Sequence, residues 1–295
     1  RFELLPYVVQ KASYLDISEQ NPFKKENTLK TSMGLDFKLG LTSNFTVTGS
    51  LNPDFGQVEV DPAQLNLTTQ ELFYEEKREF FIEDKTLFYF GKLGTNNNQF
   101  FSLGTPVLLY SRRIGAAPRA LFKESYDYSY IPKETQILGA IKLTGKLDNT
   151  TTVGVISALT DKELGSYSLN NKEFKKEIEP LTNYSALRLI KDINSQSAGI
   201  GLFLTAVNRD LTDESMRTNF SKNSYTLGFD GWYHLDNSKE YVLYGSVLGS
   251  HVQGSHEYIS QLQKSPLRYL NRPDAGFMKY DSTRSSLSGL YGWVG

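Results

Sequence analysis

The densest group of residues that could do chemistry lies between positions 52 and 91, where acidic and aromatic side chains are interleaved. Two carboxylates at a suitable separation can serve as the acid and the nucleophile or base of a glycosidase. Glu59 with Glu71, or Glu76 with Glu83, are the pairs that this segment offers. A calcium site is the second option, because Asp54, Glu59 and Asp61 could supply oxygen ligands, although no EF-hand spacing is present.

Charge pairing is the third interpretation of these acids, and the one we favour. Glu75 to Glu79 is a run of mixed charges, and Arg112 and Arg113 follow further along the chain. A buried polar interior must compensate its charges, so we expect the acids to pair with these arginines. We therefore predict no catalytic residue, no bound metal and no cofactor. The predicted docking or lumen residues are Asp54, Glu59, Asp61, Glu71, Glu76, Lys77, Arg78, Arg112 and Arg113, and the predicted binding residues of a late loop are Arg268, Arg272 and Asp274.

Composition excludes several classes of protein. The chain has 295 residues and three histidines. It has no cysteine, which excludes disulfides and thiolate metal sites. Its net charge of −1 gives no case for nucleic acid. No phosphate loop, dinucleotide fingerprint or zinc motif occurs. No apolar run approaches the roughly 20 residues of a membrane helix, whereas a membrane β-barrel alternates apolar and polar residues and needs no such run.

The segments around the acidic stretch alternate strictly, as half-buried strands do. Met33, Leu35, Phe37 and Leu39 make one such face, and Ile200, Leu202 and Leu204 make another, each opposite small or polar residues. Tight turns are expected at 42–44, 147–149, 193–195 and 236–238, and long loops at 16–29, 161–182, 209–222 and 253–284.

Short turns at one rim and long loops at the other are typical of an antiparallel transmembrane β-barrel of the outer-membrane type. Tyr225, Tyr233, Tyr241, Tyr291 and Trp293 are placed as an interfacial aromatic girdle would be. A soluble β-sandwich with one solvated face is the alternative fold.

Strand direction locates the acidic segment. The strand that ends at Leu51 and the strand that begins near Gln136 meet the same rim, so residues 52–135 leave and re-enter there. This insertion is an enlarged outer loop, a constriction folded into the lumen, or a loop with its own hairpin around Val107–Arg113. We expect residues 1–295 to form one β-barrel domain that is incomplete at its C-terminal end and belongs to a larger barrel.

Several motifs resemble a Gram-negative outer-membrane family of unknown function. They are DFGQVEVDPAQLNLT (54–68), EEKREFFIED (75–84), YSRRIG (110–115), ILGAIKLTGK (137–146), EPLTNYSALRL (179–189) and LRYLNRPDAG (267–276). Proteins of this family carry a β-barrel that usually follows a carbohydrate-binding domain of the family-9 type. Nothing in this chain resembles that N-terminal domain.

The resemblance and the alternation together predict a protein of the cell outer membrane, in contact with membrane lipid and lipopolysaccharide. Its expected role is uptake of a glycan-like solute, or that of an accessory subunit that contacts other outer-membrane proteins or glycans. A surface glycoside hydrolase or carbohydrate-binding module using residues 52–91 is the alternative.

Overall fold

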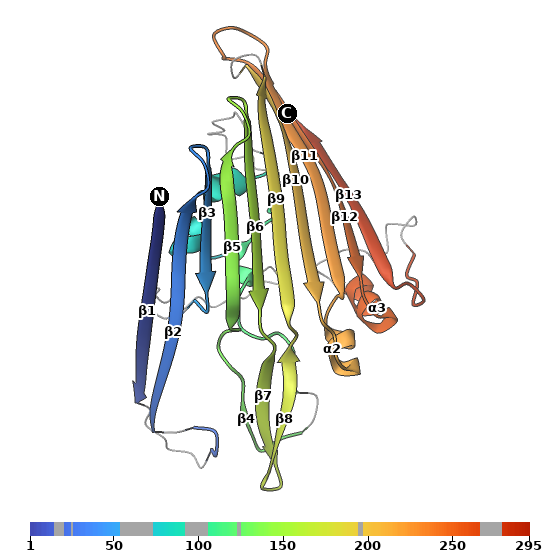
Figure 1. The fold of residues 1–295 in the computed structure, drawn as a ribbon. Helices are drawn as coiled ribbons and strands as arrows, with labels where there is room; N and C mark the ends of the chain where they lie inside the picture. The colour runs from blue at the N-terminus through green and yellow to red at the C-terminus, as the bar shows by residue number, and fades with distance from the viewer. Residues whose placement is uncertain are drawn as a thin grey trace.

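The computed structural model describes residues 1–14, 21–24, 26–53, 73–91, 106–122, 125–193, 197–265 and 279–295. The chain is an all-β protein with short helices in its connections, which confirms the predicted class (Figure 1). The strands are β1 (Phe2–Tyr14), β2 (Asn27–Gly40), β3 (Phe45–Leu51), β4 (Tyr128–Tyr130), β5 (Ile137–Lys146), β6 (Thr151–Thr160), β7 (Glu163–Leu169), β8 (Lys172–Glu179), β9 (Thr182–Ile193), β10 (Ala198–Arg209), β11 (Asn223–His234), β12 (Val242–Gln253) and β13 (Ser286–Val294). The helical elements are α1 (Glu79–Ile82), η1 (Lys85–Phe88), η2 (Ser111–Arg113), α2 (Glu214–Asn219) and α3 (His256–Lys264).

Ten strands form one antiparallel sheet in the order β1-β2-β3-β5-β6-β9-β10-β11-β12-β13, and β4, β7 and β8 form a second, small sheet. Within the part of the chain that the structure describes, β1 and β13 are the two edges of the large sheet and do not pair with each other. The sheet is therefore an open curved wall (Figure 1). We expected this chain to form an incomplete part of a larger barrel, and no closed barrel is seen among the described strands. β1 runs without a break through Pro6, which an edge strand tolerates because its outer side needs no donor.

The predicted alternation of short and long connections is confirmed. The β2–β3, β5–β6 and β11–β12 turns lie at one end of the sheet, at the top of Figure 1, where β9 also ends and β10 begins. The strands that the long connections join meet those connections at the other end. We name this second end the long-loop rim. It carries the small sheet, α2 and α3.

The long connections contain more regular structure than the sequence led us to expect. Residues 161–182, predicted as a loop, form the β7–β8 hairpin, whose turn residues Asn170 and Asn171 both have positive φ (52° and 60°). Two left-handed residues make the tight turn that suits a twisted hairpin. Asp213 and Ser255 cap the N-termini of helices α2 and α3, and their side chains accept hydrogen bonds from Met216 N and Tyr258 N.

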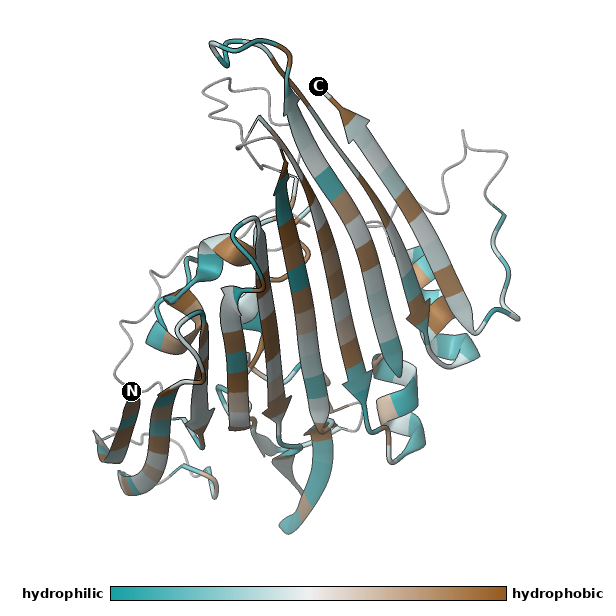
Figure 2. Ribbon diagram, turned by 45° about the horizontal axis from the view of Figure 1, so that its top comes forward, coloured by the Kyte–Doolittle hydropathy of each residue, from teal (hydrophilic) through white to brown (hydrophobic). Residues whose placement is uncertain are grey.

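The two faces of the large sheet differ sharply. On one face, which we call the open face, apolar side chains such as Ile141, Phe229 and Val247 remain between 44% and 49% exposed. The other face, which we call the insert face, is covered by residues 73–91 and 106–122 and buries Lys142 and Arg188. Apolar and polar residues alternate along the strands accordingly (Figure 2).

The core lies between the insertion and the insert face. Phe80, Phe81, Phe88, Phe90 and Ile114 of the insertion pack on Ile137, Ala140, Ile156, Ala158, Ala186, Phe203 and Leu248 of the strands. Strict alternation would put Ile137 on the same face as Gly139, but a register shift between these two residues turns Ile137 towards the core.

Two predicted girdle aromatics face the other way. The pairing of Leu248 with Tyr291 and of Ser246 with Trp293 places both aromatics on the insert face, and Tyr291 packs against the core. Tyr225, Tyr233 and Tyr241 are exposed, as a girdle requires.

Candidate functional site: a strap across the insert face

Residues 73–91 cross the strands of the large sheet on its insert face, and we call them the strap. It begins at a buried ion pair between two of the predicted residues, Glu76 and Arg78. Arg78 Nη2 lies 2.6 Å from Glu76 Oε2, and its Nε donates to Glu76 Oε1 at 2.8 Å. Each side chain is only 7% exposed.

The same arginine joins the strap to the second half of the insertion. Arg78 donates to the carbonyls of Ser111 and Ile114, both at 2.7 Å, and Ser111 Oγ donates to Glu76. Burial alone would raise the pKa of Glu76, but the hydrogen bonds and charge of Arg78 outweigh it and hold that pKa below its ordinary value. Glu76 is therefore a structural carboxylate at neutral pH.

Lys142 of β5 is the first anchor of the strap. Its side chain is 2% exposed, and Nζ donates to the carbonyls of Phe80 at 2.7 Å and Glu83 at 2.6 Å. Lys38 of β2 forms a salt bridge with the Glu83 carboxylate. Burial alone would raise the pKa of Glu83, but Lys38 and Lys142 together hold it below its ordinary value.

The middle of the strap rests on small residues. A Cβ atom on Gly154 would lie 2.6 Å from Leu87, and one on Gly228 would lie 2.7 Å from Phe90. Phe203 of β10 lies between them, with ring centroids 6.4 Å from Phe88 and 6.3 Å from Phe90. Glycine at these two positions lets the strap approach the backbone of the sheet.

The second anchor is a fully buried ion pair between β9 and β11. Arg188 donates to both oxygens of Asp230, at 2.7 and 2.8 Å, and the two side chains are 0% and 1% exposed. Asp230 Oδ2 also accepts from Gly91 N at 2.8 Å, which fixes the end of the strap. The pair passes over Gly201 of β10, where a Cβ atom would lie 2.3 Å from Asp230 Oδ1.

Residues 106–122 lead back to the long-loop rim. Gly115 has a φ of +79°, and the backbone N–H of Thr135 donates to its carbonyl at 3.2 Å. Arg119 Nη2 lies 3.2 Å from Glu179 Oε1, and its backbone N–H donates to Oε2 at 3.0 Å. The hairpin considered for Val107–Arg113 is replaced by the short helix η2.

The predicted site residues are only partly brought together. Glu76 and Arg78 pair with each other and with Ser111, the residue before Arg112; Lys77, Arg112 and Arg113 also make contacts, and Arg113 lies over the Tyr110 ring. The other predicted residues lie outside the described ranges, and so does the calcium candidate: Asp54, Glu59, Asp61, Glu71, Arg268, Arg272 and Asp274. Within the described ranges, no three His, Asp or Glu side chains are grouped as metal ligands. Glu76 and Glu83, one proposed catalytic pair, are each bound to a basic side chain.

Sequence reasoning missed the anchors Lys38, Lys142, Arg188 and Asp230. The sequence held a signal for them, because successive strand residues point to opposite faces. Each of these charged residues directly follows an apolar one: Phe37, Ile141, Leu187 and Phe229. The Arg188–Asp230 pair has a recognisable pattern. Two opposite charges lie on the polar faces of β9 and β11, and the strand between them, β10, has a glycine opposite Asp230.

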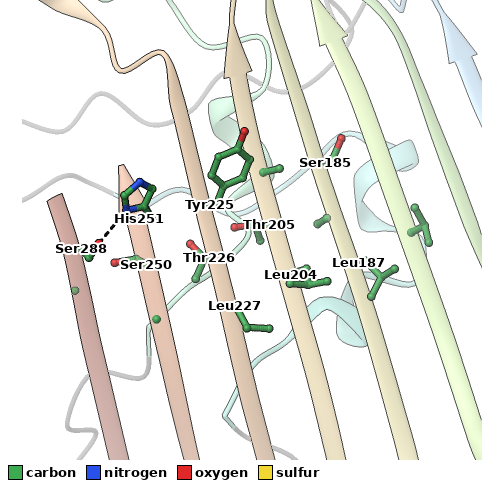
Figure 3. A pocket seen from close by; sticks show the side chains of 15 residues that line it. Ser185, Leu187, Leu204, Thr205, Tyr225, Thr226, Leu227, Ser250, His251 and Ser288 are labelled. Atoms are coloured by element: carbon green, nitrogen blue, oxygen red, sulfur yellow. Dashed lines mark hydrogen bonds between the residues drawn. The ribbon is translucent and has the colours of Figure 1, made fainter. Parts of the chain in front are cut away.

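A hollow lies on the open face of the large sheet. It has a volume of about 650 Å³ and spans β6 to β13, with Leu187, Leu204 and Leu227 in its floor (Figure 3). His251 Nδ1 and Ser288 Oγ are hydrogen-bonded at 2.8 Å at one end (Figure 3). This apolar hollow has no contact with the strap, which lies on the opposite face.

Comparison with known proteins places the chain within a family. The model of a domain of unknown function, DUF5916, matches residues 1–261. This finding agrees with the resemblance to a family of unknown function. No curated protein and no solved structure matches the chain. Among the described residues, no helix is both long and apolar enough to cross a bilayer.

Proposed function

The chain belongs to the DUF5916 family, and we propose that it is an outer-membrane β-barrel protein whose strap narrows a polar interior. In this proposal the open face of the large sheet contacts lipid and the insert face lines the interior. The protein would serve the uptake of a glycan-like solute, or act as an accessory subunit of an outer-membrane assembly. The observation that carries the proposal is the reversed polarity of the two faces.

The open face exposes more apolar surface than a water-soluble sheet normally does. Leu204, Leu227, Phe229, Tyr233, Leu243 and Val247 lie on neighbouring strands and are each between 38% and 51% exposed. Soluble monomers rarely expose contiguous apolar patches beyond a few hundred Å². Exposed apolar area costs roughly 25 cal/mol per Å² in water, and contact with lipid removes that cost.

The insert face has the charges that an aqueous or polar interior requires. Lys142, Arg188 and Asp230 project from the strands towards the insertion, and each binds a carbonyl, a backbone N–H or an opposite charge. Charged residues in strands that cross a bilayer belong on the interior side, because a charge at mid-membrane on the lipid side costs about 2–4 kcal/mol.

The strap is the element that would control passage. It crosses the interior side from β2 and β5 to β9 and β11, and the buried side chains of Lys142 and Asp230 bind it near its middle and at its end. We propose that the strap sets the width of the path and that release of one anchor widens it.

Lipid contact is tested with single cysteines, because the chain has none of its own. Phe229→Cys and Thr226→Cys lie on the open and insert faces of the same strand. In reconstituted vesicles, a polarity-sensitive fluorophore at residue 229 should be quenched by lipid-borne quenchers, and one at residue 226 should not. Equal quenching at both sites, or a monomer that stays soluble without detergent, would overturn the proposal.

The role of the strap is tested separately by flux. Lys142→Met removes one anchor, and we expect faster efflux of neutral oligosaccharides from vesicles than with the parent protein. Exposed Lys146 at the end of β5, changed to Met, is the matched control. Unchanged efflux in Lys142→Met would remove the gating role and leave the accessory role.

A further inference from the structure

Two arginines meet at the long-loop rim on the insert face. Arg209 ends β10, and its Nη1 donates to the hydroxyl of Ser221 at 2.7 Å and to the carbonyl of the same residue at 3.2 Å. The Arg119 guanidinium lies 4.7 Å from the ring centroid of Phe220, the preceding residue. Both cations therefore converge on the Phe220–Ser221 dipeptide.

The carboxylate of Glu179, which lies near both arginines, already binds Arg119. The Glu179 side chain is 7% exposed, and its carboxylate accepts from both the guanidinium and the backbone N–H of Arg119. Among the described residues, the acceptors that Arg209 binds are neutral: the Ser221 carbonyl and hydroxyl.

Arg209 also has donors to spare. Its Nε is buried, and neither Nε nor Nη2 donates to an acceptor in the part of the chain that the structure describes. A guanidinium that is largely buried without a counter-ion is costly, and the Nε–Nη2 edge is the one that binds oxyanions in a bidentate manner. Arg119, with a side chain 56% exposed, is the accessible partner.

We propose that Arg209 and Arg119 form a binding site for an oxyanionic group, a carboxylate or phosphate carried by a small solute. The bound anion would supply the counter-charge that Arg209 lacks, and Arg119 would close over it from the solvent side. This site deepens the proposed function. It rests on that function in one respect: uptake is what would bring a solute to this rim. An interior that takes up glycan-like solutes would then prefer acidic ones at its entrance.

The test is titration calorimetry on the full chain with three probes: inorganic phosphate, glucuronate and glucose. We expect saturable binding of phosphate, glucuronate or both, and none of glucose. Arg209→Gln retains a donor for Ser221 and should weaken binding more than about tenfold, because charge-assisted bonds are the stronger ones. Arg217→Gln, at an exposed arginine of α2 on the same rim, is the matched control and should bind as the parent does.

Each outcome decides between a site and its absence. Phosphate alone identifies a phosphate-bearing solute, and glucuronate alone identifies a carboxylate-bearing one. No binding, or an equal loss in Arg217→Gln, overturns the proposal. If Arg209→Gln lowers the melting temperature and fails to fold fully, exposed Arg119→Gln decides: weakened binding at an unchanged melting temperature supports the site, and unchanged binding overturns it. Failure of binding leaves the lipid-contact experiment unaffected, so the two proposals fail separately.

Discussion

Phe229 and Asp230 are neighbours on β11 that lie in opposite environments. Phe229 pairs with Val247 across the open face and is 44% exposed, whereas Asp230 is bound to Arg188 and to the strap and is 4% exposed. In a water-soluble sheet the phenylalanine would be buried and the carboxylate solvated. One step along the strand thus separates a face that needs an apolar partner from a face that needs charge compensation.

Breaking the buried pair should have the largest effect. Asp230→Ala leaves Arg188 as an uncompensated buried charge, which costs about 3–5 kcal/mol in free energy of unfolding. Denaturant unfolding in micelles measures this change. The double variant Arg188→Met with Asp230→Leu removes both charges and should recover most of the loss; a double variant as unstable as the single one would mean that the pair does more than compensate charge.

A charged residue introduced on the open face distinguishes a lipid environment from an aqueous one. Phe229→Arg should cost about 2–4 kcal/mol in a bilayer if this residue lies near mid-membrane. The control is Leu235→Arg in the β11–β12 turn, which should cost far less. Unfolding of both variants from lipid vesicles gives the comparison, and equal small effects would place residue 229 in water.

Two glycines offer a matched pair of smaller changes. Gly201→Ala puts a Cβ atom 2.3 Å from Asp230 Oδ1 and should destabilise the fold by about 1–3 kcal/mol through overpacking. Gly249→Ala lies on the open face with nothing within 4 Å of its Cβ position and should be close to neutral. Melting temperatures of the two variants check the difference, and a destabilising Gly249→Ala would show that something covers the open face there.

The pH dependence of the strap should be the smallest effect. The pKa of Glu76 in the folded state lies below its ordinary value of 4.5, so its contribution to stability is fully present above pH 4.5. That contribution is lost as the pH falls below 4.5 and through the folded-state pKa. Glu76→Gln should flatten the stability profile in this range, while Glu75→Gln, at an exposed neighbour, should leave it unchanged.

The sequence was a good guide to the frame and a poor one to the insertion. Alternation along β2, β10 and β11 follows from residue type because each strand has one apolar face. The path of the strap depends on contacts between residues far apart in the chain, and no local period encodes these. The turn at Asn170 and Asn171 was missed although its residues favour left-handed backbone, because the flanking strands are rich in lysine and glutamate.

The remaining differences between sequence and structure concern the face of the sheet to which single side chains point. One extra residue near Ile137 inverts the face of that side chain, and a pattern of alternating residues cannot reveal such a shift. Tyr291 and Trp293 alternate as a lipid-facing row would, and only the pairing with β12 assigns them to the insert face. Lys142 and Arg188 were recognisable in principle, because each stands between two apolar residues of an alternating strand: Ile141 and Leu143, and Leu187 and Leu189.

The bond between Gly91 and Asp230 also has a consequence for the order of folding. These residues are 139 positions apart in the sequence, so the far end of the strap cannot be fixed until β11 has formed. Contacts of such long range slow folding, because the entropy of closing the loop is lost before any contact rewards it. During synthesis the strap emerges well before its second anchor, and Phe88 and Phe90 must wait for Phe203 and Gly228. Docking of the strap is therefore expected to be a late and slow kinetic phase, which stopped-flow refolding of Asp230→Asn would alter selectively.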